Sequence, residues 1–177
     1  MIELFYDSQA LACFILQNEL GQRACMDLLK RVYEEDAEFL HPDYRGHEKA
    51  LVSDVLYWVD YLTDKVTIDR EFPAIEKDFT NTGHMLVKEN IVSEYPGFDM
   101  FFMSMRLKLR FLEPRGYTRL KLRTLLKGYG YKRRTAALVE HIRDCIYFYH
   151  IEPALRGGEV CDIREIDIDD MITFRIL

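Results

Sequence analysis

Apolar residues recur with a helical period along the first third of the chain. The segment 8–17 is apolar on most sides and predicts a short buried helix, which Asp7 or Ser8 can cap because either side-chain oxygen can accept from the unbonded amides of a first turn. Apolar stripes over 19–34 and 47–63 predict two longer helices, each with one buried face. We therefore expect the front of the chain to be helical, and we detect no internal repeat in it.

The spacing of apolar residues changes from a helical period to alternation in the middle of the chain. A helix is predicted over 83–95, closed by Tyr95-Pro96-Gly97, and the residues from 103 to 112 then alternate between apolar and polar types. A spacing of two places the apolar set on one face of a strand and three cations on the other. We therefore predict a strand at 103–112.

The pentapeptide Arg-Leu-Lys-Leu-Arg occurs at 106–110 and again at 119–123. If both copies are strands, they form a hairpin whose solvent face carries six cations. We favour a second interpretation, in which a short strand at 117–120 runs into a helix at about 121–127. Leucines spaced four apart support that helix, and Gly128 is a natural stop for it.

The last third of the chain predicts a helix followed by two strands. Residues 128–135 (GYGYKRRT) form a predicted turn that leads into a helix over 135–149, with Thr135 as a suitable N-cap. Alternating residues at 163–168 and 171–176 predict a terminal β-hairpin. Strand, helix, turn, helix and hairpin then follow one another as in a winged helix-turn-helix.

The predicted fold class is α+β: a helical N-terminal part, then a winged-helix-like C-terminal part with a terminal β-hairpin. We divide the chain into an acidic helical region, 1–98, and a basic strand and helix-turn-helix region with the hairpin, 99–177; the two can also pack as one domain. The 177 residues are 49% hydrophobic and 31% charged, which excludes a disordered polymer. No apolar run reaches the roughly 18 residues of a membrane helix, so we expect no membrane association.

Charge is distributed very unevenly along the chain. The net charge is −6, yet residues 100–139 contain 11 Lys/Arg and a single acid, Glu113. Residues 1–99 contain 9 Lys/Arg and 20 Asp/Glu, and residues 140–177 contain 4 and 9. A block of like charges repels itself, so the basic block needs a counter-charge, which is either a polyanion or the acidic flanks of the same chain.

Three of the cations, Lys132, Arg133 and Arg134, stand directly before the N-cap of the helix predicted over 135–149. They disfavour that helix on its own, because the N-terminal end of the helix dipole is already positive. An anion at this point would face backbone amides and cations together, which favours a phosphate of a nucleic acid. The alternative is that these cations pair with Asp and Glu of the acidic segments.

The region from about 117 to 177 resembles a known kind of module. The segments LLKGYGYKRRT (125–135) and VEHIRDCI (139–146), Pro153 and the terminal IDIDDMITFRIL are similar to small winged-helix-like modules of bacterial proteins associated with restriction and phage defence. The resemblance implies association with nucleic acid. It implies nothing about residues 1–100, for which we recognise no family.

The acidic character of the predicted hairpin departs from that pattern, because wings of DNA-binding modules are often basic. An acidic wing cannot lie against phosphate without a Coulomb penalty, so contact would come from residues 106–134 alone. Glu165, Asp167 and Asp169 would share one strand face, where we interpret them as a solvated edge that resists aggregation rather than as a Mg²⁺ site.

The sequence gives no other specific chemistry. Its four cysteines form no C-x-x-C pair, and we interpret them as reduced thiols of a cytoplasmic protein. No two histidines have the i, i+4 spacing of a zinc site, so we assign no metal and no cofactor. A Walker-type loop and a G-x-S-x-G elbow are both absent from the sequence, and we assign no catalytic residue.

The sequence favours a non-enzymatic protein that binds nucleic acid, DNA in preference to RNA, as a regulator or a defence-system accessory. One alternative is a protein-interaction subunit that forms a homo- or hetero-oligomer, such as a homodimer, through acidic and basic faces. Another is a ribonuclease that uses Arg134 and His141, whose spacing occurs in the Arg-to-His motif of a helical ribonuclease family. The expected phosphate contacts are Arg106, Lys108, Arg119, Lys121, Arg123, Lys132, Arg133 and Arg134.

Overall fold

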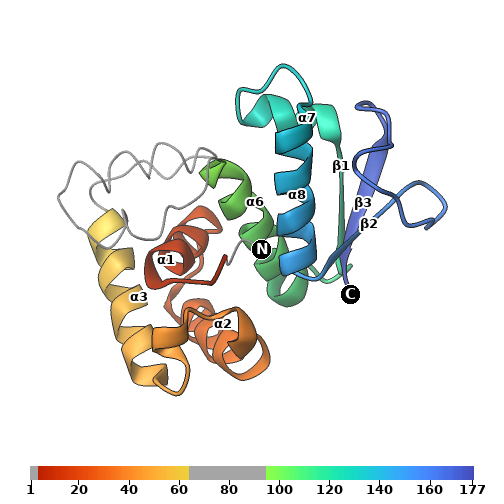
Figure 1. Cartoon of the computed structure of the whole chain (residues 1–177). Coiled ribbons are helices and arrows are strands. Elements are labelled where there is room, and N and C mark those ends of the chain that lie inside the picture. The colour runs from red at the N-terminus through yellow and green to blue at the C-terminus, as the bar shows by residue number, and fades with distance from the viewer. Residues whose placement is uncertain (1–3, 64–94) are drawn as a thin grey trace. The chain divides into compact units, whose positions relative to one another are not determined.

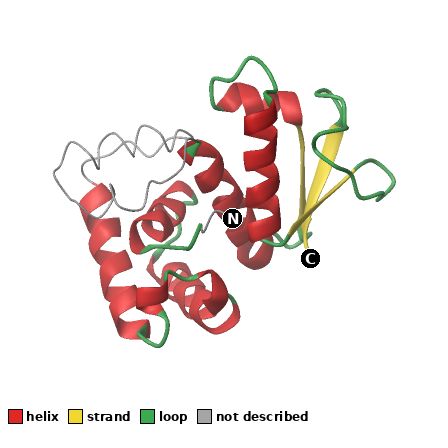
Figure 2. Cartoon of the chain, in the orientation of Figure 1, coloured by secondary structure: helices red, strands yellow, loops and turns green. Residues whose placement is uncertain are grey.

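The structure is a computed structural model and describes residues 4–63 and 95–177. These residues group into two units, coloured along the chain in Figure 1 and by secondary structure in Figure 2. Residues 5–63 form the N-terminal unit, which is helical. Leu4 and residues 95–177 form the C-terminal unit, which combines helices with a three-stranded antiparallel sheet. The predicted α+β class is therefore confirmed.

The N-terminal unit is organised around α1 (Ser8–Gln17), which is buried from Ser8 to Ile15. As predicted for either candidate cap, an Asp7 carboxylate oxygen accepts from the Ala10 amide at 2.7 Å. α3 (Glu48–Thr63) packs against α1, and α2 (Gln22–Glu35) packs against α3. These helices confirm the three that the apolar stripes predict.

Two short 3₁₀ helices, Ala37–Phe39 and Pro42–Tyr44, join α2 to α3. The segment before α1 lies beside this connection, and Tyr6 forms a parallel β-bridge with Leu40. The Tyr6 hydroxyl also donates to a buried carboxylate oxygen of Asp36 at 3.2 Å. This contact ties the end of α2 to the start of the unit, and a buried hydrogen bond to a charged acceptor is of the stronger kind.

The C-terminal unit contains a central strand flanked by two others, and helices pack on the sheet. The sheet order is β1-β3-β2, and both pairings with β3 are antiparallel. Ile172 and Phe174 of β3 are buried, and the Phe174 ring lies 6.2 Å from that of Phe102, a residue of the first helix of this unit. The elements are, in chain order, α6 (Pro96–Leu107), a π-helical segment η3 (Lys108–Leu112), β1 (Tyr117–Lys121), α7 (Leu122–Gly128), α8 (Ala136–Phe148), β2 (Ile151–Ala154) and β3 (Met171–Ile176).

The strand predicted at 103–112 is wrong, because the segment is the end of α6 followed by η3. Met, Leu, Arg and Lys, which make up most of it, are strong helix formers, and it contains no β-branched residue. The apparent alternation arises because α6 is buried on most sides, so apolar residues occur at nearly every phase of the helix. The helix predicted over 83–95 lies outside the described residues, and Pro96, taken as its stop, instead occupies the first turn of α6, where its missing amide costs nothing.

The predicted partner strand at 163–168 is also wrong, since only 171–176 forms a strand and its neighbours are β1 and β2. Aspartates explain the error. Asp162 accepts from the Arg164 amide at 2.9 Å and Asp167 accepts from the Asp169 amide at 2.8 Å. Such local side-chain bonds compete with a sheet ladder and favour turns. The proposed row of carboxylates on one strand face is therefore absent from this segment.

The central part of the C-terminal unit follows the sequence prediction closely. β1 and α7 confirm the strand at 117–120 that runs into a helix, and α8 confirms the helix at 135–149. The Thr135 hydroxyl accepts from the Leu138 amide at 3.2 Å, as its role of N-cap requires. Within residues 4–63 and 95–177, no helix combines the length and the apolar character needed to cross a membrane.

Candidate nucleic-acid interface

The residue spacing of α7 determines which side chains face solvent. Arg123 and Lys127 are exposed, and the opposite face is buried and consists of Leu122, Leu125 and Leu126. After α7 the chain turns back at Gly130, whose φ of 79° lies in the left-handed region that glycine adopts without steric cost. The buried leucines thereby direct the cations of this helix outward.

The turn between α7 and α8 adds three exposed cations, the last of which is Arg134. The Tyr131 amide donates to the Leu126 carbonyl at 3.0 Å and closes the turn, and Lys132 and Arg133 follow it. α7, this turn and the loop before β3 lie at one end of the C-terminal unit (Figure 1). We call five of the exposed cations at this end the α7 cluster: Lys121, Arg123, Lys127, Lys132 and Arg133.

One carboxylate lies against the α7 cluster. Asp169 accepts two hydrogen bonds from Arg123, each 2.6 Å long, and the Arg123 amide donates to the Ile168 carbonyl at 2.9 Å. The hydrogen bonds from Arg123, with the nearby charges of Lys121 and Lys127, hold the pKa of Asp169 below its usual range. Both partners are about half exposed, so the net stabilisation from this pair is small. Within the described parts of the chain, no ion pair involves Lys121, Lys127, Lys132 or Arg133.

Arg106 is buried inside the C-terminal unit. Its side chain is 4% exposed, and Nη1 donates to the Tyr149 carbonyl at 2.7 Å. Tyr149 caps the C-terminal end of α8, where a cation is favourable because the helix dipole is negative there. Arg106 thus stabilises the packing of α6 on α8 and is not available to an external phosphate.

Arg134 is exposed, and its guanidinium contacts the loop before β3. Its Nη1 donates to the Ile166 carbonyl at 2.6 Å and to the Ile163 carbonyl at 3.4 Å. The two remaining predicted contacts are exposed and lie outside α7 and the turn after it. Lys108 lies on η3, and Arg119 lies on β1, where its guanidinium is 5.2 Å from the centre of the Tyr117 ring. Four of the eight predicted residues therefore belong to the α7 cluster: Lys121, Arg123, Lys132 and Arg133.

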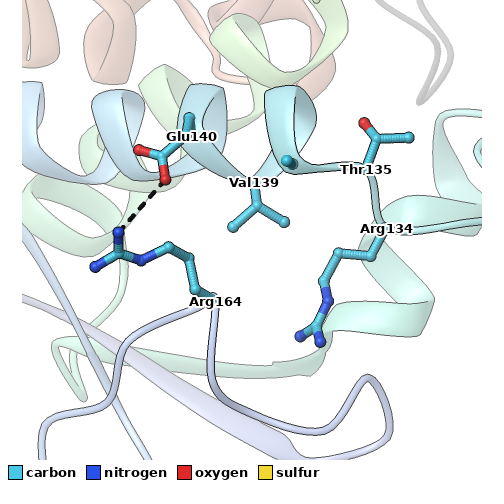
Figure 3. A pocket seen from close by; sticks show the side chains of 6 residues that line it. Arg134, Thr135, Val139, Glu140 and Arg164 are labelled. Atoms are coloured by element: carbon cyan, nitrogen blue, oxygen red, sulfur yellow. Dashed lines mark ion pairs between the residues drawn. The ribbon is translucent and has the colours of Figure 1, made fainter.

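Arg134 also lines a pocket of about 250 Å³ at the start of α8. In Figure 3, Val139 lies between Arg134 on one side and the pair formed by Glu140 and Arg164 on the other. That ion pair is 3.6 Å long, and Arg164 also binds Asp162 at 2.7 Å. The carboxylates compensate much of the guanidinium charge around this pocket, which distinguishes it from the α7 cluster.

A second group of polar side chains lies between α6 and α8. Asp99 of α6 and His141 and Cys145 of α8 place one oxygen, one nitrogen and one sulfur atom within 4.8 Å of one another. Burial, followed by the charge of Asp99, raises the pKa of the Cys145 thiol. These are the described residues whose atoms could hold a metal ion.

Sequence reasoning missed three features of these sites. Lys127 belongs to the α7 cluster, and its exposure follows from the same leucine spacing that predicts α7. His141 and Cys145 have the i, i+4 spacing that brings two side chains to one helix face, but a search for histidine pairs alone overlooks them. Asp99 and Asp169 are 42 and 46 positions from their main partners, so no local signal could have found them.

Comparisons of the chain with models of protein families, with curated proteins and with solved structures give no match.

Proposed function

We propose that the C-terminal unit is a winged-helix-like module and that this chain binds nucleic acid, DNA in preference to RNA, through the phosphate backbone. The role is non-enzymatic, that of a cytoplasmic regulator or defence-system accessory. The α7 cluster makes the contact.

The order of elements supports the winged-helix-like assignment. A helix, a strand, two helices joined by a tight turn and two further strands follow one another from α6 to β3. The sheet order β1-β3-β2 places the last strand between the other two. The connection between β2 and β3, residues 155–170, takes the position of the wing.

The charge of the α7 cluster is the observation that carries the proposal. Four exposed cations, Lys121, Lys127, Lys132 and Arg133, lie at one end of the unit without an ion pair to any described residue. Like charges held together on a surface repel one another, and a polyanion removes that repulsion while it releases its own counterions. The phosphate backbone of a nucleic acid is a polyanion of this kind.

The neighbouring surfaces favour contact with the backbone over reading of bases. The exposed side of α8 carries Glu140 and Asp144, and the 155–170 loop contains six acidic residues and two arginines. Carboxylates there oppose deep insertion of α8 into a groove lined by phosphates. Since phosphate contacts carry no sequence information directly, we expect weak sequence preference.

The test is binding of a fluorescently labelled DNA duplex, followed by anisotropy at about 0.1 M salt, to the Lys132→Ala/Arg133→Ala double variant. Each lost phosphate contact should weaken binding by about a factor of ten, and thus by about a hundredfold for both. The matched control is Arg23→Ala/Lys49→Ala, which removes the same charge from exposed positions of the N-terminal unit and should leave binding nearly unchanged.

Equal weakening by both double variants would show that only total charge matters and would contradict the assignment to the α7 cluster. Absence of binding by the wild-type protein, together with an oligomer that dissociates in salt, would instead favour a protein-interaction subunit. Tighter binding of single-stranded RNA than of duplex DNA would overturn the stated DNA preference.

The geometry gives no support to the ribonuclease hypothesis. His141 is 6% exposed, and its ring nitrogen is bound to Asp99. Arg134 donates to backbone carbonyls of the 155–170 loop. A catalytic histidine would need access to the ribose and the phosphate of a substrate, which a buried imidazole lacks.

A further inference from the structure

A buried group of three polar side chains lies between α6 and α8. Asp99 stands in the first turn of α6, and His141 and Cys145 stand one turn apart on the facing side of α8. His141 is 6% exposed, Cys145 is fully buried, and the Asp99 side chain is 13% exposed. Burial of an ionisable carboxylate is unfavourable unless a cation or several donors compensate it, so this arrangement needs a physical reason.

The three side chains converge on one point instead of pairing separately. The same oxygen of Asp99, Oδ1, lies 2.5 Å from His141 Nε2 and 3.5 Å from Cys145 Sγ. All three ligand atoms lie within 4.8 Å of one another. A tetrahedral zinc ion, with bonds of about 2.0–2.3 Å, keeps its ligand atoms roughly 3.3–3.6 Å apart, so a small opening between Nε2 and Oδ1 suffices to admit the ion.

The chemistry of the three atoms selects the kind of metal. One thiolate, one imidazole nitrogen and one carboxylate oxygen together suit Zn²⁺ or Co²⁺ better than Mg²⁺ or Ca²⁺, which prefer oxygen ligands only. The i, i+4 spacing of His141 and Cys145 is one that presents two ligands from a single helix face. Asp99 is the most exposed of the three, and a water molecule would complete the coordination.

We propose that Asp99, His141 and Cys145 bind a zinc-like divalent transition metal that joins α6 to α8. On binding, the Cys145 thiol loses its proton to solvent as the metal–sulfur bond forms. The proton between His141 Nε2 and Asp99 Oδ1 also leaves to solvent, and each atom bonds to the metal. The divalent ion carries two positive charges and the thiolate and carboxylate two negative ones, so the buried site becomes neutral. The proposal is independent of nucleic-acid binding.

The experiment loads the reduced full-length protein with Co²⁺ after removal of bound metal, and records its absorption spectrum. The wild type should bind about one equivalent and show a thiolate-to-cobalt charge-transfer band in the near ultraviolet together with the visible bands of a four-coordinate ion. Cys145→Ser should lose the charge-transfer band. Cys161→Ser is the matched control, since Cys161 lies in the same unit outside this group, and it should retain the band.

A wild-type protein without the charge-transfer band would overturn the proposal, as would a band that survives in Cys145→Ser or disappears in Cys161→Ser. If Cys145→Ser fails to fold, X-ray absorption of the zinc-loaded wild type decides the matter. The proposal requires a first shell with a single sulfur and at least one imidazole, and a shell made only of oxygen and nitrogen, or with more than one sulfur, contradicts it.

Discussion

The two copies of Arg-Leu-Lys-Leu-Arg adopt different structures although their sequences are identical. The first copy, 106–110, spans the end of α6 and the start of η3, and the second, 119–123, spans the end of β1 and the start of α7. In the first copy the leading arginine is 4% exposed and bound to a carbonyl, whereas in the second the leading arginine is exposed. Tertiary context thus decides both the local conformation and whether a cation belongs to the core or to the surface.

The leucine at the second position gives the largest expected difference between the copies. Leu107 is fully buried, whereas Leu120 is only half-buried. Leu107→Ala should lower the free energy of unfolding by about 3 kcal/mol, through lost burial and the cavity that remains, and Leu120→Ala by less than about half of that. Urea unfolding followed by far-ultraviolet circular dichroism measures both, and equal losses would contradict the burial difference.

The leading arginine gives the next largest effect. Arg106→Ala removes the donor to the Tyr149 carbonyl and should cost about 2 kcal/mol, because the carbonyl remains buried without that partner. Arg119→Ala should change stability by no more than about 0.5 kcal/mol, as is usual for exposed positions. The same unfolding experiment applies, and a tolerated loss of Arg106 would mean that its buried contact is not a stabilising one.

The central lysine of each copy tests DNA binding, whereas the leucine and the leading arginine test the stability of the fold. Lys121 belongs to the α7 cluster, so Lys121→Ala should weaken DNA binding by about tenfold at 0.1 M salt. Lys108→Ala removes the same charge from η3 and should weaken it by less than about half of that amount in free energy. Anisotropy titrations measure both variants, and a larger loss for Lys108 would move the interface to the η3 side.

Much of this fold could be predicted from the sequence, and the errors have a common physical origin. The period of apolar residues predicts a helix correctly where one face is buried, as in α2, α3 and α8. Thr135, the predicted N-cap, correctly marks the start of α8. Prediction from the spacing of apolar residues fails at 103–112, because a helix buried on most sides shows no distinct polar stripe, and at 163–168, because aspartate side chains satisfy the backbone locally.

The candidate site was predictable only in part for the same kind of reason. The cations of the basic block are evident from composition, but Arg106 and Arg134 contact carbonyls that lie 43 and 32 positions away in sequence. Such contacts depend on the packing of α6 on α8 and on the path of the 155–170 loop. No local pattern encodes either arrangement, so sequence alone could not separate cations that bind carbonyls of their own unit from those of the α7 cluster.

The smallest expected effect is on the pH dependence of stability, and it involves Arg123, the last arginine of the second copy. Arg123 lowers the pKa of Asp169, and Arg164 lowers that of Asp162. A carboxyl with a lower pKa in the folded state contributes stability above its unfolded pKa of about 4, and that contribution disappears as pH falls through the folded pKa. Asp162→Asn/Asp169→Asn should therefore lose less stability than the wild type between about pH 5 and pH 2. If urea unfolding shows that the free energy of unfolding falls equally with pH in the variant and in the wild type, this linkage is contradicted.

The most direct test of the account is the salt dependence of DNA binding by the wild-type protein. Four cations of the α7 cluster that lack an ion pair to any described residue predict that the logarithm of the binding constant falls with the logarithm of salt concentration at a slope of about −4. A slope near zero, or no binding at low salt, would contradict the claim that these outward-facing cations bind phosphates.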